Sequence, residues 1–483
     1  MEAHEKNRAI FQNLSPIDHR YSISEAPLFE ALVPWISEEA SITACVKAEI
    51  ALVLAHLSVR GNLNPSLRED LEAAAKAISP AEVYAEEEKT RHNIRALVNV
   101  LKRKVPRDLA PLVHLGATSV DILDTSLSWR VRGVTRNVAL PELKRLEILL
   151  CDFAEKEAET PQVGRTHGQH AVPITLGFAM AEYVSRLGKS ILEIQRLAGQ
   201  LKGKLAGAVG AYNATSVIVQ DPQELERLYL KELDLEPSEH STQLVEPEYL
   251  LRLLLEMNVA FGIIANLADD LRNLQRSEIG ELRVGFAADQ VGSSTMPQKR
   301  NPWNSEHVKS LWKAFMPRVT TFFMDQISEH QRDLSNSASQ RFIADYIAGF
   351  CLAVTRMAQV IEGLGADRLR LLANLRGDGK ASGIPGGVLA EPAYILLAES
   401  GVSDAHELIR KITITAEKDR LSFAAALKKE PDILARIGKK MADLGLVAEA
   451  GDALSWFEKP EQYRGLAAKK AKELAVKYRR LMK

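Results

Sequence analysis

The fold is decided by one stretch, YLLRLLLEMNVAFGIIANLADDLRNLQRSEIGEL, which covers residues 249–282. Apolar side chains recur throughout it at three- and four-residue intervals, which predicts one long helix. The part from Leu250 to Ala268 is apolar around much of its circumference, more than a single small domain needs to bury. We therefore expect a bundle of long helices whose surplus apolar surface packs against other subunits.

The same periodicity continues outward from this stretch in both directions. Long helices are predicted at 118–159, 174–204, 303–330 and 338–364, with a kink at Pro141 and with Pro317 inside the helix at 303–330. Shorter helices are predicted at 28–35, 40–57 and 68–77, and after the glycines at 377–387, ending in the basic run 469–483. The expected fold is all-α, with three helical domains in series: an N-terminal domain (1–117), a central long-helix bundle (118–365) and a C-terminal domain (366–483).

Composition narrows the class of protein. The chain has 483 residues, 46% of them hydrophobic and 26% charged, and its 62 basic residues nearly cancel its 63 acidic ones. No global field draws it to nucleic acid or to a membrane, so an anion site must be local. The longest nearly apolar run, Val259 to Ala265, is too short to span a bilayer. Three widely spaced cysteines in apolar patterns predict buried reduced thiols and a cytoplasmic protein.

A polar loop is predicted between the helices at 249–282 and 303–330. From Gly292 to Pro302 it reads GSSTMPQKRNP, which packs hydroxyls, amides, an ammonium and a guanidinium into a few residues. That set of groups suits an anionic substrate. The alternative is an ordinary Ser/Gly linker with a turn at Met296-Pro297.

The segment from Arg332 to Arg341 is a second candidate for anion binding. Ser335, Asn336 and Ser337 are natural N-caps, and Ser337 and Arg341 would share one face of the helix that begins there. Free N–H groups, a hydroxyl and two guanidiniums would suit a phosphate. The alternative is a capped helix with surface arginines.

Histidines mark two further segments. His167 and His170 lie between Gly164 and Pro173, and His92 follows Arg91. Without nearby cysteines or clustered carboxylates, a metal site at the two histidines is not favoured. Glycines at 203, 207 and 210 follow no strand pattern and do not indicate a dinucleotide site.

The string from Gly292 to Pro302 resembles the signature G-S-S-x-M-P-x-K-x-N-P of the fumarase/aspartase superfamily, whose lyases eliminate across a C–N or C–O bond to release fumarate. Within it, nearly the whole chain resembles the adenylosuccinate lyase family. The motifs that carry this likeness are SPIDHRY (15–21), Thr118-Ser119, GRTHGQHAVP (164–173), TQLVEP (242–247), Arg332 with Ser337 and Arg341, and PEQYRGLA (460–467).

The resemblance implies a role for each matching residue. Ser293 would be the base, His167 the acid for the leaving nitrogen, and His92 an orienting second histidine. Binding of substrate is implied for Arg20, Tyr21, Arg91, Thr118, Ser119, Thr166, Gln243, Lys299, Asn301, Arg332, Ser337 and Arg341. Arg20 and Tyr21 would contact the nucleotide, Lys299 and Asn301 the carboxylate that takes up charge, and Arg332, Ser337 and Arg341 the phosphate.

The elimination explains why these residue types are needed. A serine is a poor base at its free pKa, so nearby cations and N–H donors must activate it. A histidine titrates in the range needed to protonate a leaving amine. The resemblance implies a small nucleotide substrate, a homotetramer with shared active sites, and no cofactor or metal.

Two positions depart from the family pattern, and other readings stay open. Asn93 stands where the family usually has Asp, and Gln298 is more typical of argininosuccinate lyase. An argininosuccinate-type lyase or a carboxymuconate cycloisomerase would keep the fold and change the reaction. A non-catalytic scaffold of the same fold, as in some lens crystallins, would not need Ser293, His167 and Lys299 together.

Overall fold

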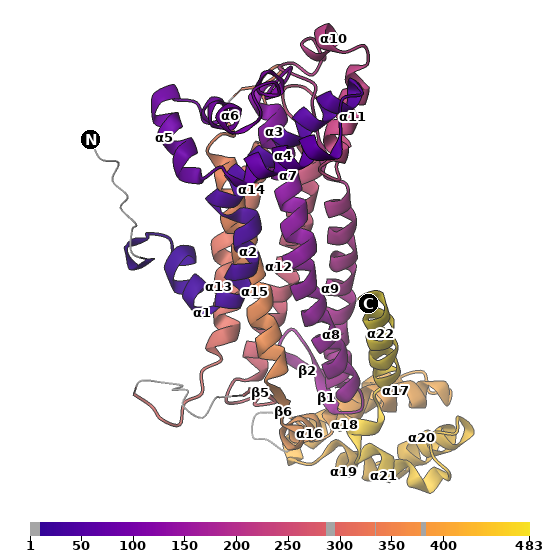
Figure 1. Ribbon diagram of the computed structural model, residues 1–483. Helices are drawn as coiled ribbons and strands as arrows, with labels where there is room; N and C mark the ends of the chain where they lie inside the picture. Colours follow the sequence, from indigo (N-terminus) through magenta and orange to yellow (C-terminus); the bar gives the residue numbers. More distant parts are fainter. Residues whose placement is uncertain (1–9, 286–294, 334, 378–382) are drawn as a thin grey trace. The chain divides into compact units, whose positions relative to one another are not determined.

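The structure is a computed structural model that describes residues 10–285, 295–333, 335–377 and 383–483 (Figure 1). The helices of the first half are α1 (Ser22–Ser24), α2 (Ala26–Ile36), α3 (Glu38–Val59), α4 (Pro65–Lys76), α5 (Pro80–Thr90), α6 (Asn93–Lys104), α7 (Ser119–Val134), α8 (Leu140–Lys156), α9 (Leu176–Gly199), α10 (Thr215–Ile218) and α11 (Pro222–Lys231). Those of the second half are α12 (Glu248–Leu274), α13 (Trp303–Phe315), α14 (Arg318–Met324), α15 (Ile343–Glu362), α16 (Arg368–Arg376), α17 (Ala390–Glu399), α18 (Ala405–Asp419), α19 (Phe423–Lys428), α20 (Pro431–Asp443), α21 (Ala453–Phe457) and α22 (Ala467–Leu481).

Short turns and strand pairs complete the described part of the chain. The 3₁₀ turns are η1 (Ile10–Gln12), η3 (Ala110–Leu112), η5 (Ser339–Phe342), η6 (Gly387–Leu389), η7 (Ala450–Asp452) and η8 (Pro460–Gln462), and the π-helical turns are η2 (Ile17–Tyr21) and η4 (Thr135–Ala139). The strands are β1 (Pro161–Thr166), β2 (Gln169–Thr175), β3 (Lys202–Gly203), β4 (Glu236–Pro237), β5 (Leu282–Val284) and β6 (Leu364–Ala366). They form three two-stranded sheets, β1-β2 and β5-β6 antiparallel and β3-β4 parallel.

By compactness the chain divides into two units. Unit 1 comprises residues 1–143, 190–262 and 310–355, and unit 2 comprises 144–189, 263–309 and 356–483. Each unit therefore combines segments that are far apart in the sequence.

The core of unit 1 lies where α3, α4, α6 and α11 gather (Figure 1). It is built from fully buried leucines such as Leu52, Leu71, Leu101 and Leu225. α3 begins at Glu38 because the Ser37 side chain accepts a hydrogen bond from the Ala40 N–H (3.0 Å), and two glutamates follow in the first turn. α5 begins with a capping box between Ser79 and Glu82.

Prolines mark two irregularities of the long helices, of which the one at Pro141 was predicted. Before Pro141, α7 passes into α8 through the π-helical turn η4, because a proline cannot donate to the preceding turn and its ring crowds that carbonyl. Pro317 separates α13 from α14, so the predicted helix at 303–330 is two helices.

Unit 2 has its own core in the C-terminal helices α17 to α21, which grade from orange to yellow in Figure 1. Leu397, Ile409, Phe423 and Ile437 are each almost fully buried there. The structure confirms the all-α class. However, the predicted loop at 164–173 is an antiparallel hairpin, since β1 and β2 pair from Pro161↔Thr175 to Thr166↔Gln169.

The expectation that no segment is long enough to cross a bilayer was wrong on length and composition alone. Three stretches meet that criterion, Ala26–Val59, Glu248–Leu274 and Ser339–Glu362, with 78%, 56% and 83% of their most apolar windows buried inside the protein. Interior helices of a large bundle have the same length and composition, because they are apolar on most faces.

Candidate active site

Thr118 and Ser119 lie at the start of α7 in unit 1. Thr118 is the N-cap and Ser119 the first helical residue. The Thr118 N–H donates to Asp121 Oδ2 (2.7 Å). Both hydroxyl residues are half-buried, so a ligand can reach them at a helix N-terminus.

Two segments of unit 1, one around Gln243 and one around Gln331, meet beside α7. The backbone N–H of Gln243 donates to the Gln331 carbonyl oxygen (3.4 Å), and Val245 N–H donates to Asp124 Oδ2 (3.1 Å). Burial raises the Asp124 pKa from 3.8 to about 6, opposed by the Val245 bond and by the charges of Lys204 and Arg332. The structure thus brings the predicted residues Gln243 and Arg332 to the helix that carries Thr118 and Ser119.

The segment 332–341 differs from the predicted capped helix. Residues 335–338 form a turn, η5 follows as a 3₁₀ helix, and α15 begins only at Ile343. Ser337 and Arg341 therefore do not share an α-helical face, because a 3₁₀ helix has three residues per turn. Asp333 takes the capping contacts instead, accepting from both the N–H and the hydroxyl of Ser335 (2.8 and 2.5 Å).

The side chains of this segment are nevertheless placed to meet a ligand. Ser337 and Arg341 are exposed, and Arg332 is half-buried with its Nε donating to the Asp333 carbonyl oxygen (2.8 Å). The Arg341 charge also acts on Tyr84 of α5, where burial and a bond to Glu38 raise the pKa of the phenol to about 12. The Arg341 charge therefore reaches α5, the helix whose C-cap is Arg91.

Arg91 and His92 form the junction between α5 and α6. Arg91 has left-handed backbone geometry (φ 53°) and ends α5, while His92 is the N-cap of α6. The Arg95 N–H donates to His92 Nδ1 (3.2 Å), so the proton of a neutral ring sits on Nε2. Both side chains are exposed. The Asn93 amide oxygen accepts from the Ile94 N–H (2.8 Å).

Arg20 and Tyr21 end the π-helical turn η2. Arg20 is exposed and Tyr21 is half-buried. This segment also belongs to unit 1.

Thr166 and His167 lie at the tip of the β1-β2 hairpin in unit 2. His167 and Gly168 both have positive φ (53° and 73°) between the paired residues Thr166 and Gln169, as a type I′ turn requires. A left-handed histidine is uncommon, and such strain concentrates at functional sites. The turn leaves the imidazole of His167 exposed to solvent or ligand.

A buried glutamate, which the sequence did not indicate, anchors the base of this hairpin. Glu281 is fully buried and accepts hydrogen bonds from Arg165 (2.5 and 3.1 Å), Gln162 (2.8 Å) and Asn374 (2.9 Å). Burial and the nearby Arg165 charge lower the pKa of His170, the second histidine of the hairpin, opposed by Glu281.

The signature loop is described only in its second half. Ser293 lies outside the described residues. The Lys299 N–H donates to the Met296 carbonyl oxygen (3.0 Å), which closes the predicted turn around Pro297. Lys299 is exposed and Asn301 is half-buried before α13. These residues and His167 belong to unit 2.

The residues that the structure describes include side chains of the metal-ligating types and three cysteines. No group of three or more His, Cys, Asp or Glu side chains there could hold a metal ion. The three cysteines are free and buried, as predicted, and burial raises the pKa of Cys45 to about 11.

Comparison with protein families matches most of the chain. A family model described as lyase matches residues 35–314, and one described as adenylosuccinate lyase C-terminal matches residues 328–446. The adenylosuccinate lyase of Pyrococcus abyssi is 32% identical over 433 residues, 87% of this chain and 90% of the relative. That of Archaeoglobus fulgidus is 30% identical over 95% of this chain and 97% of the relative.

Solved structures share the fold. A 3-carboxy-cis,cis-muconate lactonizing enzyme from Pseudomonas putida superposes with a TM-score of 0.79 at 25% identity, over 94% of this chain and 98% of that one. A fumarate lyase from Mesorhizobium superposes with a TM-score of 0.77 at 20% identity, over 93% and 97% of the two chains.

Proposed function

The chain belongs to the adenylosuccinate lyase family of the fumarase/aspartase superfamily, and from this we propose which residues carry out its reaction. It is a carbon–nitrogen lyase that eliminates fumarate from adenylosuccinate and leaves AMP. We extend this to the related release of fumarate from SAICAR, which leaves AICAR.

In the elimination, a base removes the proton beta to the leaving nitrogen, the C–N bond breaks, and an acid protonates that nitrogen. We assign Ser293 as the base and His167 as the acid. Lys299 and Asn301 would hold the carboxylate that takes up the carbanion charge. Thr166 would bind the substrate beside His167. The exposed position of His167 at a two-residue turn supports its role, since an acid must come within hydrogen-bond reach of the leaving nitrogen.

The nucleotide would be held by residues of unit 1. Arg332, Ser337 and Arg341 would bind the phosphate, Arg20 and Tyr21 the nucleotide, and Thr118, Ser119 and Gln243 the substrate near the reacting atoms. His92 would orient the substrate through its Nε2–H, with Arg91 beside it. Hydrogen bonds join the segment around Gln243 to the segment around Gln331 and to α7. They support a common binding site formed by these unit 1 segments.

One observation carries the choice of substrate. The adenylosuccinate lyase C-terminal model begins at residue 328 and so includes the whole segment with the three phosphate-binding candidates. A carboxymuconate substrate has no phosphate to occupy them, and the likeness to that enzyme has lower sequence identity than the likeness to the two lyases.

We further propose a cytoplasmic homotetramer in which each active site combines segments from different subunits. Exposed apolar side chains on and after α14 support subunit packing, among them Phe323, Met324 and Ile327 (45%, 67% and 74% exposed). The buried free thiols suit a reducing compartment.

The phosphate assignment is tested with Arg341→Ala. Loss of a charge-assisted contact worth about 1.5–3 kcal/mol should weaken AMP binding and raise KM roughly 10- to 100-fold, with a smaller effect on kcat. Ser337→Ala should cost less, because a neutral donor is removed. Arg410→Ala, which removes an exposed arginine paired with Glu407 in the C-terminal domain, is the control.

A second experiment separates the loss of a phosphate contact from a general distortion of the substrate site. Removing the phosphate from the substrate should reproduce much of the Arg341→Ala defect, and the two changes together should be less than additive. Full additivity, or normal AMP binding by the variant, would refute the phosphate assignment.

A further inference from the structure

A buried ion pair lies directly behind the Thr118-Ser119 turn. We propose that Asp121 and Lys204 act as a positioning pair that sets the geometry of this turn for substrate. The inference rests on the proposed function of Thr118 and Ser119, because it assigns to two other residues the task of holding them.

The two oxygens of Asp121 serve different segments. Oδ2 accepts from the Thr118 N–H (2.7 Å) and so holds the helix start. Oδ1 accepts from the Lys204 ammonium and from the N–H groups of Ala206 and Gly207 (3.2 and 3.3 Å). One carboxylate therefore ties α7 to the segment that follows β3.

The pair is completely enclosed. The side chains of Asp121 and Lys204 are both 0% exposed, and Lys204 Nζ also donates to the Gly207 carbonyl oxygen (3.3 Å). A buried ion pair adds little net stability, because desolvation offsets the attraction, and apolar replacements are often neutral. Holding a geometry is therefore a better explanation for this pair than stabilising the fold.

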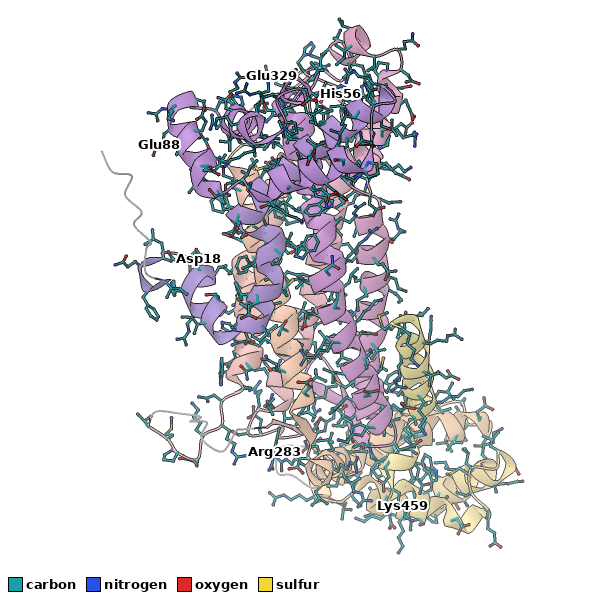
Figure 2. All side chains as sticks on the ribbon, in the orientation of Figure 1. Asp18, His56, Glu88, Arg283, Glu329 and Lys459 are labelled. Carbon is teal, nitrogen blue, oxygen red and sulfur yellow. The ribbon has the colours of Figure 1, made fainter. Side chains whose placement is uncertain are left out.

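The residues before the turn are also held by buried polar groups, here from α3. His56, labelled in Figure 2, donates from Nε2 to the Leu115 carbonyl oxygen (2.9 Å). His114 has left-handed geometry (φ 63°), and its Nδ1 lies 2.7 Å from Glu49 Oε1. Residues 114–118 are thus fixed at three points, and Asp121 supplies the one nearest to the substrate-binding hydroxyls.

An asparagine cannot do the work of Asp121. All four groups that meet the carboxylate are donors, so the NH₂ group of an amide side chain would face either the Thr118 N–H or the Lys204 side of the site. The hydrogen bonds on one side of the side chain would then be lost, and the Lys204 charge would be buried without its partner.

The test compares Asp121→Asn and Lys204→Met with the control Glu226→Gln. Glu226 is also a buried carboxylate and holds the same loop, accepting from the Leu205 N–H (2.7 Å) and the Tyr212 hydroxyl (2.6 Å), whereas the Thr118 N–H donates to Asp121. We measure Tm, kcat and KM for adenylosuccinate, and amide hydrogen exchange of the peptide 114–121 in ligand-free protein.

Asp121→Asn should lower kcat/KM roughly 10- to 100-fold and speed exchange at 114–121, while Glu226→Gln lowers Tm and leaves both unchanged. Adding Lys204→Met to Asp121→Asn should cost less than the sum of the two single changes. If Asp121→Asn does not fold, the same measurements are made on the double variant Asp121→Leu with Lys204→Met, which removes both charges.

Two outcomes overturn the proposal. One is that kcat/KM and exchange at 114–121 stay unchanged in the Asp121 variants. The other is that Glu226→Gln loses as much kcat/KM as Asp121→Asn when the two variants have the same Tm. A wild-type protein that does not turn over adenylosuccinate would instead refute the proposed function. Hydrogen exchange would still report whether the pair holds the turn, so the two failures are distinguishable.

Discussion

At the scale of single residues, the backbone of His167 limits what can replace it. Its φ of 53° is tolerated best by glycine and asparagine. His167→Asn should therefore leave Tm unchanged while kcat falls about 10²- to 10⁴-fold, the usual contribution of a general acid, with little change in KM. Steady-state kinetics and thermal unfolding of the same preparation check this. A loss of substrate binding as large as the loss of rate would contradict the acid role.

Asp124 gives a prediction for the pH dependence of stability. Burial raises its pKa from 3.8 to about 6. Between these values the folded chain keeps a proton that the unfolded chain has lost, so the free energy of unfolding falls as pH rises, by at most about 3 kcal/mol. Asp124→Asn keeps an acceptor for the Val245 N–H and removes the ionisation.

Urea unfolding of Asp124→Asn and wild type at pH 4 and at pH 8 checks this prediction. The variant should be relatively more stable at pH 8 than at pH 4, because only the wild type has an ionised carboxylate to bury at the higher pH. Parallel changes in the two proteins between these pH values would show that Asp124 titrates normally.

At the scale of elements, the β1-β2 hairpin depends on Glu281. Glu281→Gln leaves the Arg165 charge without its buried partner, which should cost about 3–5 kcal/mol of unfolding free energy. kcat should fall as well, because the hairpin carries His167. Arg283→Ala is the matched control from β5: Arg283, labelled in Figure 2, is 72% exposed and pairs with Asp367, so its loss should cost less than about 1 kcal/mol.

Denaturant unfolding and kcat of the two variants check the anchor. Equal losses from Glu281→Gln and Arg283→Ala would mean that the buried carboxylate has no special role in holding the hairpin.

Helices were predictable where apolar periodicity is long, and strands and turns were not. The stretch 249–282 predicted α12 well, and Pro141 marked the irregularity between α7 and α8 correctly, whereas the division of 303–330 at Pro317 was not predicted. The β1-β2 hairpin was missed because its turn is His-Gly, and its pairing depends on Glu281, distant in sequence. The predicted helix start at 335–337 was wrong because Asp333 takes the contacts that a capping serine would make.

At the scale of the whole molecule, the candidate residues are divided between the two units. Thr118, Gln243 and Arg332 belong to unit 1, and His167, Lys299 and Asn301 belong to unit 2. The sequence supplied these residues through motifs. It did not supply Asp121, Lys204 or Glu281 as supports, because buried partners depend on packing between distant segments.

A tetramer with shared sites predicts complementation. A His167→Asn variant and a variant with a defect in unit 1, such as Arg341→Ala, should regain part of the wild-type activity when they are unfolded and refolded together. Hybrid tetramers can then assemble sites that contain neither substitution. Sedimentation of the mixture checks the assembly, and a fully active wild-type monomer would rule out shared sites.

The central claim is the reaction itself, and turnover of adenylosuccinate tests it most directly. Purified protein should release AMP and fumarate in equal amounts, followed by absorbance and by identification of both products. Argininosuccinate and the lactone of 3-carboxymuconate, supplied in parallel, should remain unchanged. Turnover of either of these compounds with none of adenylosuccinate would contradict the account.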